Sequence, residues 1–377
     1  MSRRPPIWKR ISNPFSKPCA RHRRARLQKF NRAAQFLNRF NRQTPDRRLI
    51  SSRLSERSVI THPRFTDWPK TNDQKWFAIR KGFDLPEAYW QEFMAEYKPM
   101  WDFWQKDFRT FDPNPQPIWG ESGTPGFRAD FNQPEPSVGV RIHSGAPRSM
   151  ILVCPGGGWF WKACYEGTVV AEHFYNEGFN VAVLDYRVNP YPSTAACEDA
   201  MRAMRYLRAN AERLNTLPDK IAMMGFSAGS FLTGHCATMP PDGDPNAADP
   251  VARASSRPDA AVLCYGAGSS LPVSKGLLGY DREAQKQLSR TAIERNVNAD
   301  CPPFFIWQCA GMDDPRNATQ FADVLAACGV PFELHIFPYG NHGTALSNEL
   351  HPDPRANDPH VAHWTKLCTE WLRLYGF

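Results

Sequence analysis

The stretch KIAMMGFSAG, residues 220–229, decides the fold. Its apolar first half, residues 220–224, predicts a buried strand, and the segment 228–237 predicts a helix. Between them Ser227 is flanked by Gly225 and Gly229, the G-x-S-x-G pattern of a serine on a sharp turn. A side chain at either glycine would collide with the neighbouring strand or helix. Because the helix directs its N-terminal amides at the serine, Ser227 is a candidate nucleophile.

Strands and helices alternate around this stretch. Further strands are predicted at 138–142, 150–154, 180–184, 260–265, 304–309 and 332–337, and further helices at 168–177, 194–214, 321–328 and 361–374. Strands rich in Val, Ile and Phe between helices indicate a mostly parallel central sheet with helices on both faces, an α/β fold. Residues 266–298 do not fit the alternation, and we expect a lid-like insertion there.

Composition divides the chain into three segments. Residues 1–58 carry 17 of the 46 Lys and Arg residues but only two of the 38 acidic ones, which leaves 29 basic and 36 acidic residues elsewhere. We expect this basic extension to be disordered, with a nucleic-acid or anionic-surface arm as the alternative. Residues 59–112 are an aromatic-rich helical arm that Pro99 should break or kink. The arm packs on the body or shapes a sugar-binding cleft. Residues 113–377 form the main domain.

The cysteines and histidines limit the possible cofactors and compartments. Ten cysteines are scattered singly without metal-binding spacing, as expected of free thiols in a reducing compartment, here the cytoplasm. His360 and His363 share a helix face without a third ligand, so we expect no metal and no cofactor. No apolar run suits a signal peptide or a membrane span. The Arg-rich start is compatible with an organelle transit peptide only in a eukaryotic source.

Three loops supply the groups that a serine nucleophile needs. His342 lies in the glycine-bordered loop YGNHG after the last predicted strand, and Asp313 and Asp314 follow the strand 304–309. The glycines 156–158 follow the strand 150–154, where their amides can converge on a developing oxyanion together with the amide of Ala228. This glycine run lacks the pattern of a phosphate-binding loop.

With these pieces in this order, the chain from about residue 116 to its end resembles the α/β-hydrolase superfamily. It is most similar to the branch of acetyl xylan esterases and related carbohydrate esterases. The resemblance rests on CPGGGW at 154–159, YEG at 165–167, LDYRV at 184–188, GFSAGS at 225–230 and VPFELHIFPYGNHG at 330–343.

The resemblance also assigns roles. It implies Ser227 as nucleophile, His342 as base and Asp314 as the acid that orients the base. The segment after Asp314 is shorter than the family pattern, so Asp313 remains a rival. Backbone amides of Gly157, Gly158 and Ala228 would stabilise the oxyanion, although Pro155 stands where the family usually has a histidine.

We therefore expect a serine esterase that cleaves short-chain, acetyl esters, carried by a small molecule or by a carbohydrate such as acetylated xylan. The aromatic residues 159–161 beside the glycine loop suggest a tight acyl pocket. A general carboxylesterase or lipase, or a peptidase of the same fold, is the alternative, since fold does not select among them. A catalytically inactive binding protein whose basic extension contacts polyanions is the alternative of another class; otherwise we expect no nucleic-acid partner.

Some other side chains near these loops have less certain roles. Tyr165 and Glu166 either contact substrate or have a structural role. Arg187 and Asp199 are expected to fix loops and a helix through ion pairs.

Overall fold

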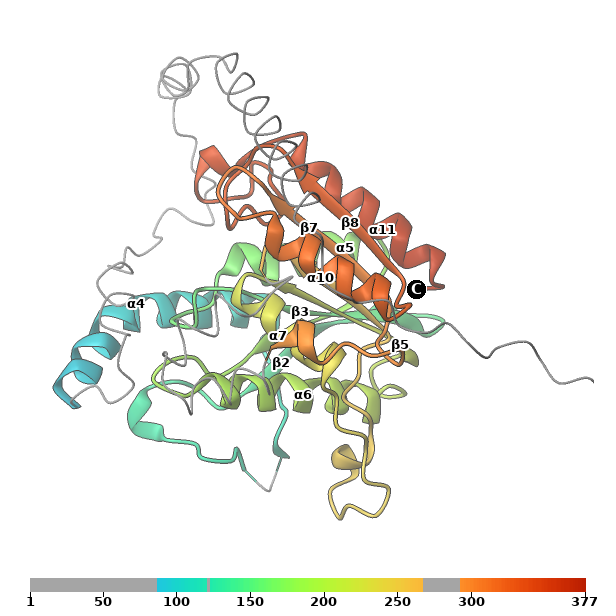
Figure 1. The fold of residues 1–377 in the computed structure, drawn as a ribbon. Coiled ribbons are helices and arrows are strands. Elements are labelled where there is room, and N and C mark those ends of the chain that lie inside the picture. The colour runs from blue at the N-terminus through green and yellow to red at the C-terminus, as the bar shows by residue number, and fades with distance from the viewer. Residues whose placement is uncertain (1–86, 121–122, 267–291) are drawn as a thin grey trace, which may run out of the picture. The chain divides into compact units, whose positions relative to one another are not determined.

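The computed structural model describes residues 87–120, 123–266 and 292–377 (Figure 1). The predicted basic extension, the arm up to residue 86 and most of the predicted insertion 266–298 lie outside these described residues. Among the helices that the structure describes, none has both the length and the apolar character needed to cross a membrane.

One eight-stranded sheet forms the centre of the fold, in the order β1-β2-β4-β3-β5-β6-β7-β8. The two strands at one edge, β1 and β2, pair antiparallel, and β2 is also antiparallel to β4, whereas the strands from β4 to β8 are parallel. This is the mostly parallel sheet that the sequence predicts. The strands are β1 (Gln116–Pro117), β2 (Ser137–Arg141), β3 (Arg148–Cys154), β4 (Asn180–Asp185), β5 (Thr216–Phe226), β6 (Ala260–Cys264), β7 (Phe304–Cys309) and β8 (Phe332–Phe337).

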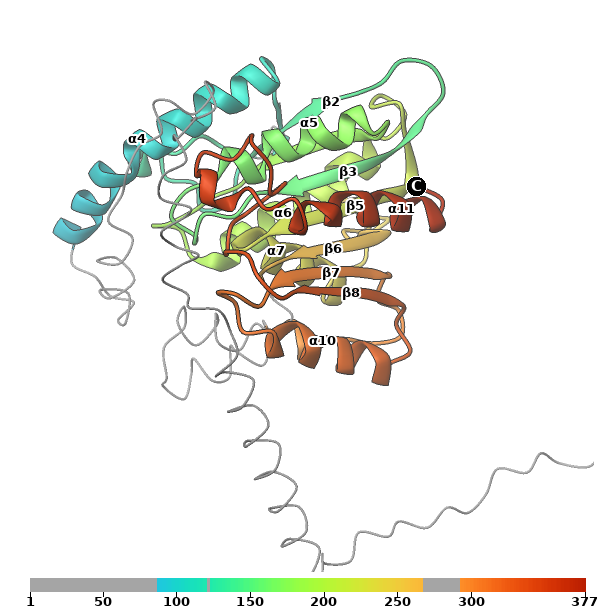
Figure 2. The same ribbon diagram turned by 90° about the horizontal axis from the view of Figure 1, so that it is seen from above.

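Helices cover both faces of the sheet, as Figure 2 shows from above. The α-helices are α4 (Glu87–Phe111), α5 (Thr168–Asn176), α6 (Ser193–Ala209), α7 (Ala228–Thr238), α10 (Arg316–Ala327) and α11 (Trp364–Leu374). Short 3₁₀ helices are η3 (Ala129–Phe131), η4 (Cys164–Glu166), η5 (Pro250–Arg253), η6 (Ile293–Arg295), η7 (Pro354–Ala356) and η8 (Val361–His363).

Alternate residues of the strands divide the hydrophobic core in two. In β3, Met150 and Leu152 belong to the half of the core that includes side chains of α6, α7 and α10, whereas Ile151 and Val153 belong to the half that includes side chains of α5 and α11. Both sets are fully buried. A strand with apolar side chains on both faces is expected where helices cover both sides of a parallel sheet.

The helix α4 contributes to both halves of the core. It continues through Pro99 as a single helix of 25 residues, so the predicted break does not occur. Tyr97 and Trp101 belong to one half of the core, and Trp104 and Phe108 belong to the other. The described part of the arm therefore packs on the sheet and its helices.

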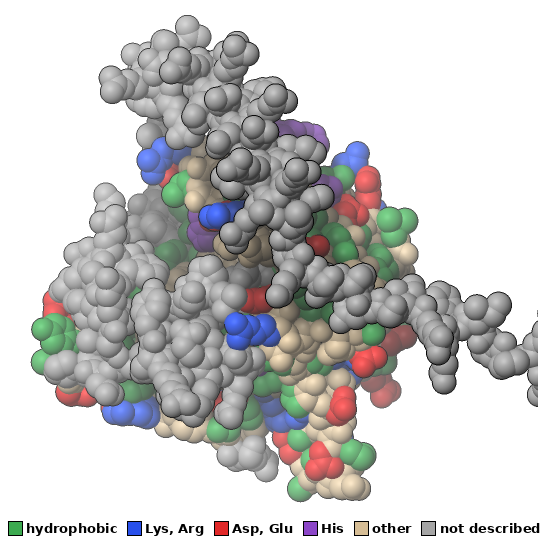
Figure 3. Space-filling view, viewed as in Figure 1, with side chains coloured by type: hydrophobic (Ala, Val, Ile, Leu, Met, Phe, Trp, Pro, Cys, Tyr) green, Lys and Arg blue, Asp and Glu red, His purple; other side chains and the backbone are tan. Residues whose placement is uncertain are grey.

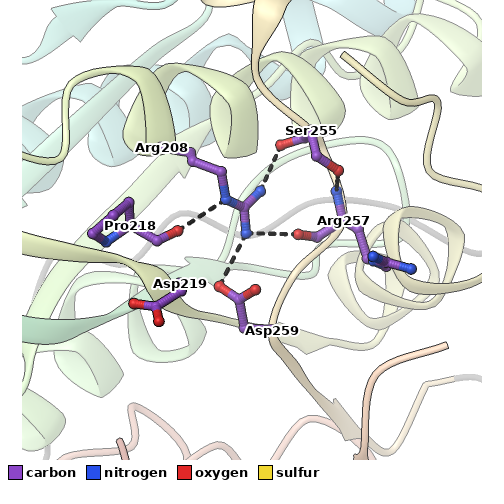
Figure 4. A pocket seen from close by; sticks show the side chains of 6 residues that line it. All are labelled: Arg208, Pro218, Asp219, Ser255, Arg257 and Asp259. Atoms are coloured by element: carbon purple, nitrogen blue, oxygen red, sulfur yellow. Dashed lines mark hydrogen bonds and ion pairs between the residues drawn. The ribbon is translucent and has the colours of Figure 1, made fainter. Parts of the chain in front are cut away.

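A polar cluster joins elements at the N-terminal ends of β5 and β6 (Figure 4). The guanidinium of Arg208, on α6, donates to the carbonyl oxygens of Pro218, Ser255 and Arg257 and pairs with the carboxylate of Asp259 at 3.0 Å. These residues line a shallow pocket. Because one side chain satisfies three carbonyls and a carboxylate, we interpret the cluster as structural.

The described surface visible in Figure 3 mixes basic, acidic and apolar side chains. This agrees with the near-balance of charges outside residues 1–58.

Candidate active site

The predicted site residues lie at the carboxyl ends of neighbouring parallel strands. Ser227 follows β5, the glycines 156–158 follow β3, the aspartates follow β7 and His342 follows β8. The carboxyl edge of a parallel sheet is where such folds bind ligands. The topology thus brings four distant parts of the chain to one place.

The turn at Ser227 has the strained backbone that the motif predicts. Ser227 has φ 50° and ψ −115°, a conformation that costs free energy for a residue with a side chain. A Cβ on Gly229 would lie 2.0 Å from the carbonyl oxygen of Cys154, and one on Gly225 would lie 2.1 Å from that of Gly229. Only glycine fits at these two positions, because real Cβ atoms do not approach backbone so closely.

A hydrogen-bonded chain links the serine, the histidine and an aspartate. The Ser227 Oγ lies 2.8 Å from the His342 Nε2, and the His342 Nδ1 lies 2.9 Å from the Asp313 Oδ1. A carboxylate only accepts, so the proton sits on Nδ1 and leaves Nε2 free to accept from the serine hydroxyl. This tautomer is the one required for a base that removes the serine proton.

The aspartate in this chain is Asp313 and not Asp314, which corrects the assignment implied by the resemblance. The Asp314 carboxylate is held by Arg316, both by its side chain and by its backbone N–H, at the start of α10. That guanidinium lowers the pKa of Asp314 to about 2. With its carboxylate committed to Arg316, Asp314 makes no contact with the imidazole.

Neighbouring charges raise the pKa of His342. Burial of the ring acts to lower it, but the hydrogen bond and charge of Asp313 and the charge of Glu166 outweigh this effect. Negative charge behind the ring stabilises the imidazolium form. His342 therefore has the environment of a base that must hold a proton during a reaction.

The glycine loop after β3, residues 155–158, lies directly against the serine turn. A Cβ on Gly156 would be 2.8 Å from the Cβ of Ser227. Gly157 and Gly158 have φ of 133° and 62°, so the turn depends on glycine. Within the described residues, the amides of Gly157 and Ala228 donate to no protein acceptor. Such amides are the donors that an oxyanion requires.

The aromatic residues after the glycine loop face different ways. Trp159 packs edge-on against Phe231 of α7, with ring centroids 5.6 Å apart. Phe160 instead packs on Phe93 and Tyr97 of α4, and its carbonyl accepts from the Trp101 indole N–H at 2.8 Å. Phe160 is thus not available to a substrate, and α4 supports the loop from behind.

Glu166, Arg187 and Asp199 make buried contacts within the protein. Glu166 is only 2% exposed and accepts from the backbone of Gly156, so it faces away from solvent. Arg187 makes a buried two-pronged pair with Asp199, as predicted, and Asp199 also accepts from the Trp119 indole. No cluster of side chains able to hold a metal ion occurs in the described segments.

Comparison with known proteins places the chain in a family. The family model BD-FAE matches residues 141–325. The solved structure of an acetyl ester–xyloside bifunctional hydrolase from Caldicellulosiruptor lactoaceticus is 34% identical and has a TM-score of 0.64. The match covers 70% of this chain and 97% of that one. The chain belongs to the α/β-hydrolase superfamily, among its carboxylic ester hydrolases.

Other relatives of this serine-esterase-type hydrolase match over shorter shares. Endo-1,4-beta-xylanase B of Butyrivibrio fibrisolvens is 33% identical over an alignment of 229 residues, and the match covers 57% of this chain and 35% of the xylanase. An acetylxylan esterase of Xylanibacter ruminicola is 26% identical over an alignment of 210 residues, and the match covers 51% of this chain and 40% of that protein. The chain thus spans about a third of the first relative and two fifths of the second.

Sequence reasoning missed one residue of the site, Tyr265. It follows β6 at the same edge of the sheet, and its ring lies edge-on to His342, with centroids 5.2 Å apart. The available signal was its place at the carboxyl end of a predicted central strand, where the neighbouring strands all carry site residues.

Proposed function

We propose that the protein is a serine esterase that hydrolyses short-chain, chiefly acetyl, esters of carbohydrates by a Ser-His-Asp mechanism. The observation that carries the proposal is the hydrogen-bonded chain from Ser227 through His342 to Asp313. Such a hydrogen-bonded triad catalyses the hydrolysis of carboxylic esters, which is the reaction of this family.

In the acylation step, the Ser227 Oγ attacks the ester carbonyl carbon while its proton passes to the His342 Nε2. The carbonyl oxygen becomes an oxyanion beside the amides of Gly157, Gly158 and Ala228, and Asp313 stabilises the imidazolium. The imidazolium then gives its proton to the leaving alcohol oxygen as the carbon–oxygen bond breaks. The products are the free alcohol and an acyl-serine.

In the deacylation step, His342 takes a proton from a water molecule while the water oxygen attacks the acyl carbon. The tetrahedral intermediate collapses, the serine oxygen leaves and regains the proton from the imidazolium, and the carboxylic acid departs. Each proton that the histidine takes is returned, so the enzyme ends in its starting state.

Two features support a short acyl group on a carbohydrate. The rings of Trp159 and Phe231 are almost fully buried and pack edge-on next to the serine turn, which leaves little room there and favours a small acyl group. Tyr339, in the loop that carries His342, is 73% exposed, and Met312 beside Asp313 is also exposed. An exposed aromatic side chain in the loop of His342 suits the apolar face of a sugar ring. The names of the xylan-related relatives point the same way.

A fluorophosphonate probe tests the nucleophile independently of the substrate. We expect the wild type to be labelled and to cleave p-nitrophenyl acetate, and Ser227→Ala to lose labelling and at least about 10³-fold in rate. Ser230→Ala is the matched control, because the Ser230 Oγ is buried on α7, three residues after Ser227, without a partner among the described residues. A Ser227→Ala variant that keeps its activity would show that another residue is the nucleophile.

A substrate panel tests the acyl and alcohol groups. We expect p-nitrophenyl acetate to be cleaved with a higher kcat/KM than the butyrate and decanoate. We also expect acetylated xylose oligosaccharides to release acetate, and Tyr339→Ala to raise KM for these and not for p-nitrophenyl acetate. A preference for decanoate would contradict the small acyl pocket.

The observed relatives also support a broader esterase as a second candidate. Esterase LipI and carboxylesterase NlhH of Mycobacterium tuberculosis are 27% and 26% identical over 223 and 209 residues. Similar rates on acetylated sugars and simple aryl esters would favour this candidate. Failure of the wild type to react with the fluorophosphonate would favour the inactive binding protein. Binding of polyanions by residues 1–58 stays a prediction, tested by heparin retention with and without them.

The nine cysteines within the described residues are free thiols, and eight of them are buried. This supports our proposal of a reducing compartment, the cytoplasm.

A further inference from the structure

A buried carboxyl group lies directly behind the glycine loop. Glu166, in η4, is almost completely shielded from solvent. Its Oε2 accepts from the backbone N–H of Gly156 at 2.9 Å, and its Oε1 accepts from the hydroxyl of Tyr265 at 2.7 Å. The mechanism above uses neither of these groups, yet a buried charged residue is retained only where its contacts compensate its desolvation.

Tyr265 extends this contact to the loop of the histidine. Its hydroxyl accepts from the backbone N–H of Ala345 at 3.0 Å, in the same loop as His342. Its ring lies edge-on to the imidazole of His342. The Tyr265 hydroxyl thus donates its one proton to Glu166, and its oxygen accepts a hydrogen bond from the Ala345 N–H.

We propose that Glu166 is a positioning residue that holds the oxyanion loop and the histidine loop in register, acting through Gly156 on one side and Tyr265 on the other. This inference rests on the proposed function of Ser227 and His342. Glu166 itself does not touch the substrate, because it is enclosed by the residues that it binds.

The geometry explains why such a residue is needed. The oxyanion amides of Gly157 and Gly158 follow β3 and the base follows β8, at opposite sides of the serine turn. No strand pairing joins these two strands, since β5, β6 and β7 lie between them. The path from Gly156 through Glu166 and Tyr265 to Ala345 bridges that gap with three hydrogen bonds. A shift of about 1 Å between donors and base can cost about 10²-fold in rate.

Two conservative substitutions test the proposal without removing bulk from the core. Glu166→Gln keeps the shape and an oxygen for the Gly156 N–H, but its amide nitrogen cannot accept the Tyr265 proton. Tyr265→Phe keeps the ring against His342 and deletes only the hydroxyl. The matched control is Glu370→Gln on α11, an exposed carboxylate that pairs with Lys366 at 3.9 Å.

The readout is kcat and KM on p-nitrophenyl acetate on the alkaline plateau of the pH–rate profile, where the effect of the Glu166 charge on the pKa of His342 no longer changes the rate, normalised to the fraction of serines that a fluorophosphonate labels. We expect each variant to lose about 10-fold in kcat with KM within about twofold, because the loops are displaced and the substrate pocket is kept. The double variant should be no worse than Glu166→Gln alone, since both changes break the same path. Glu370→Gln should match the wild type.

A purely packing role gives a different result. It would lower Tm and the labelled fraction while kcat per labelled serine stayed within about threefold of the wild type in both variants. That outcome overturns the proposal, and so do losses that multiply in the double variant, because the two groups would then act separately. If instead Ser227→Ala retained activity, the proposed function itself would fail, which is a distinct result.

Discussion

Replacing Asp313 by Asn tests the corrected acid directly. In the structure the Asp313 carboxylate is 20% exposed and accepts from the His342 Nδ1 at 2.9 Å. The charge of Asp313 stabilises the imidazolium that forms in the transition state. With charge centres roughly 4 Å apart and an effective dielectric constant of about 20, this interaction is worth about 4 kcal/mol, or about 10³-fold in rate. An amide that donates to Nδ1 would also fix the wrong tautomer, and comparable changes in triads cost about 10⁴-fold.

Asp314→Asn is the matched control at the adjacent position. Its amide oxygen can still accept from the backbone N–H of Arg316, so the start of α10 is kept. We expect Asp313→Asn to lose between about 10³- and 10⁴-fold in kcat on p-nitrophenyl acetate. Asp314→Asn should stay within about twofold of the wild type, because its carboxylate does not reach the imidazole. A large loss in Asp314→Asn with an active Asp313→Asn would refute the reasoning and restore the assignment from the resemblance.

Three further results are expected. The acid limb of kcat/KM should lie above about pH 6.5, the ordinary pKa of histidine, because the pKa of His342 is raised and only the neutral ring can accept the serine proton. Activity should therefore fall as the pH drops through the raised pKa of His342. A limb below about pH 6.5 in a pH–rate profile would contradict this. Arg208→Met should lower the free energy of unfolding by about 2 kcal/mol in urea titrations without changing kcat, because three carbonyls far from the site lose their donor, although the Asp259 carboxylate still accepts from the Ile221 N–H. Unchanged unfolding would show that the cluster is dispensable. Gly229→Ala should give little protein that a fluorophosphonate labels, because its Cβ would overlap the Cys154 carbonyl; wild-type labelling would refute the close approach.

The strands and the serine turn were predictable because their signals are local. The predicted bounds of β7 and β8 agree with the structure, and those of β6 differ by one residue. Runs of apolar residues that end at Gly or Pro leave little freedom in placing a buried strand. The Ser227 turn followed from its two glycines for the same local reason.

Hydrophobic periodicity and residue spacing did not predict the helix ends or the choice of aspartate. The helix α10 begins at Arg316, earlier than predicted, and α6 ends at Ala209, earlier than predicted. The side chains of consecutive residues point in different directions, so spacing alone cannot decide between Asp313 and Asp314. The D-x-R sequence at 314–316 held the missing information, since Asp314 is occupied by the guanidinium of Arg316 and accepts from its backbone N–H.

The contact between α4 and Phe160, directly after the glycine loop, has a consequence for how substitutions can alter turnover. Trp101 donates to the carbonyl of Phe160, and Phe93 and Tyr97 cover the Phe160 ring, so α4 fixes the chain directly after the glycine loop. A protein cut at residue 113 would keep every strand of the sheet and every reacting group. The truncated protein would nevertheless expose the Phe160 ring and carbonyl to water, and the amides of the adjacent glycine loop would be held less firmly. Substitutions in the arm can therefore adjust turnover from a distance, without altering any atom that meets the ester.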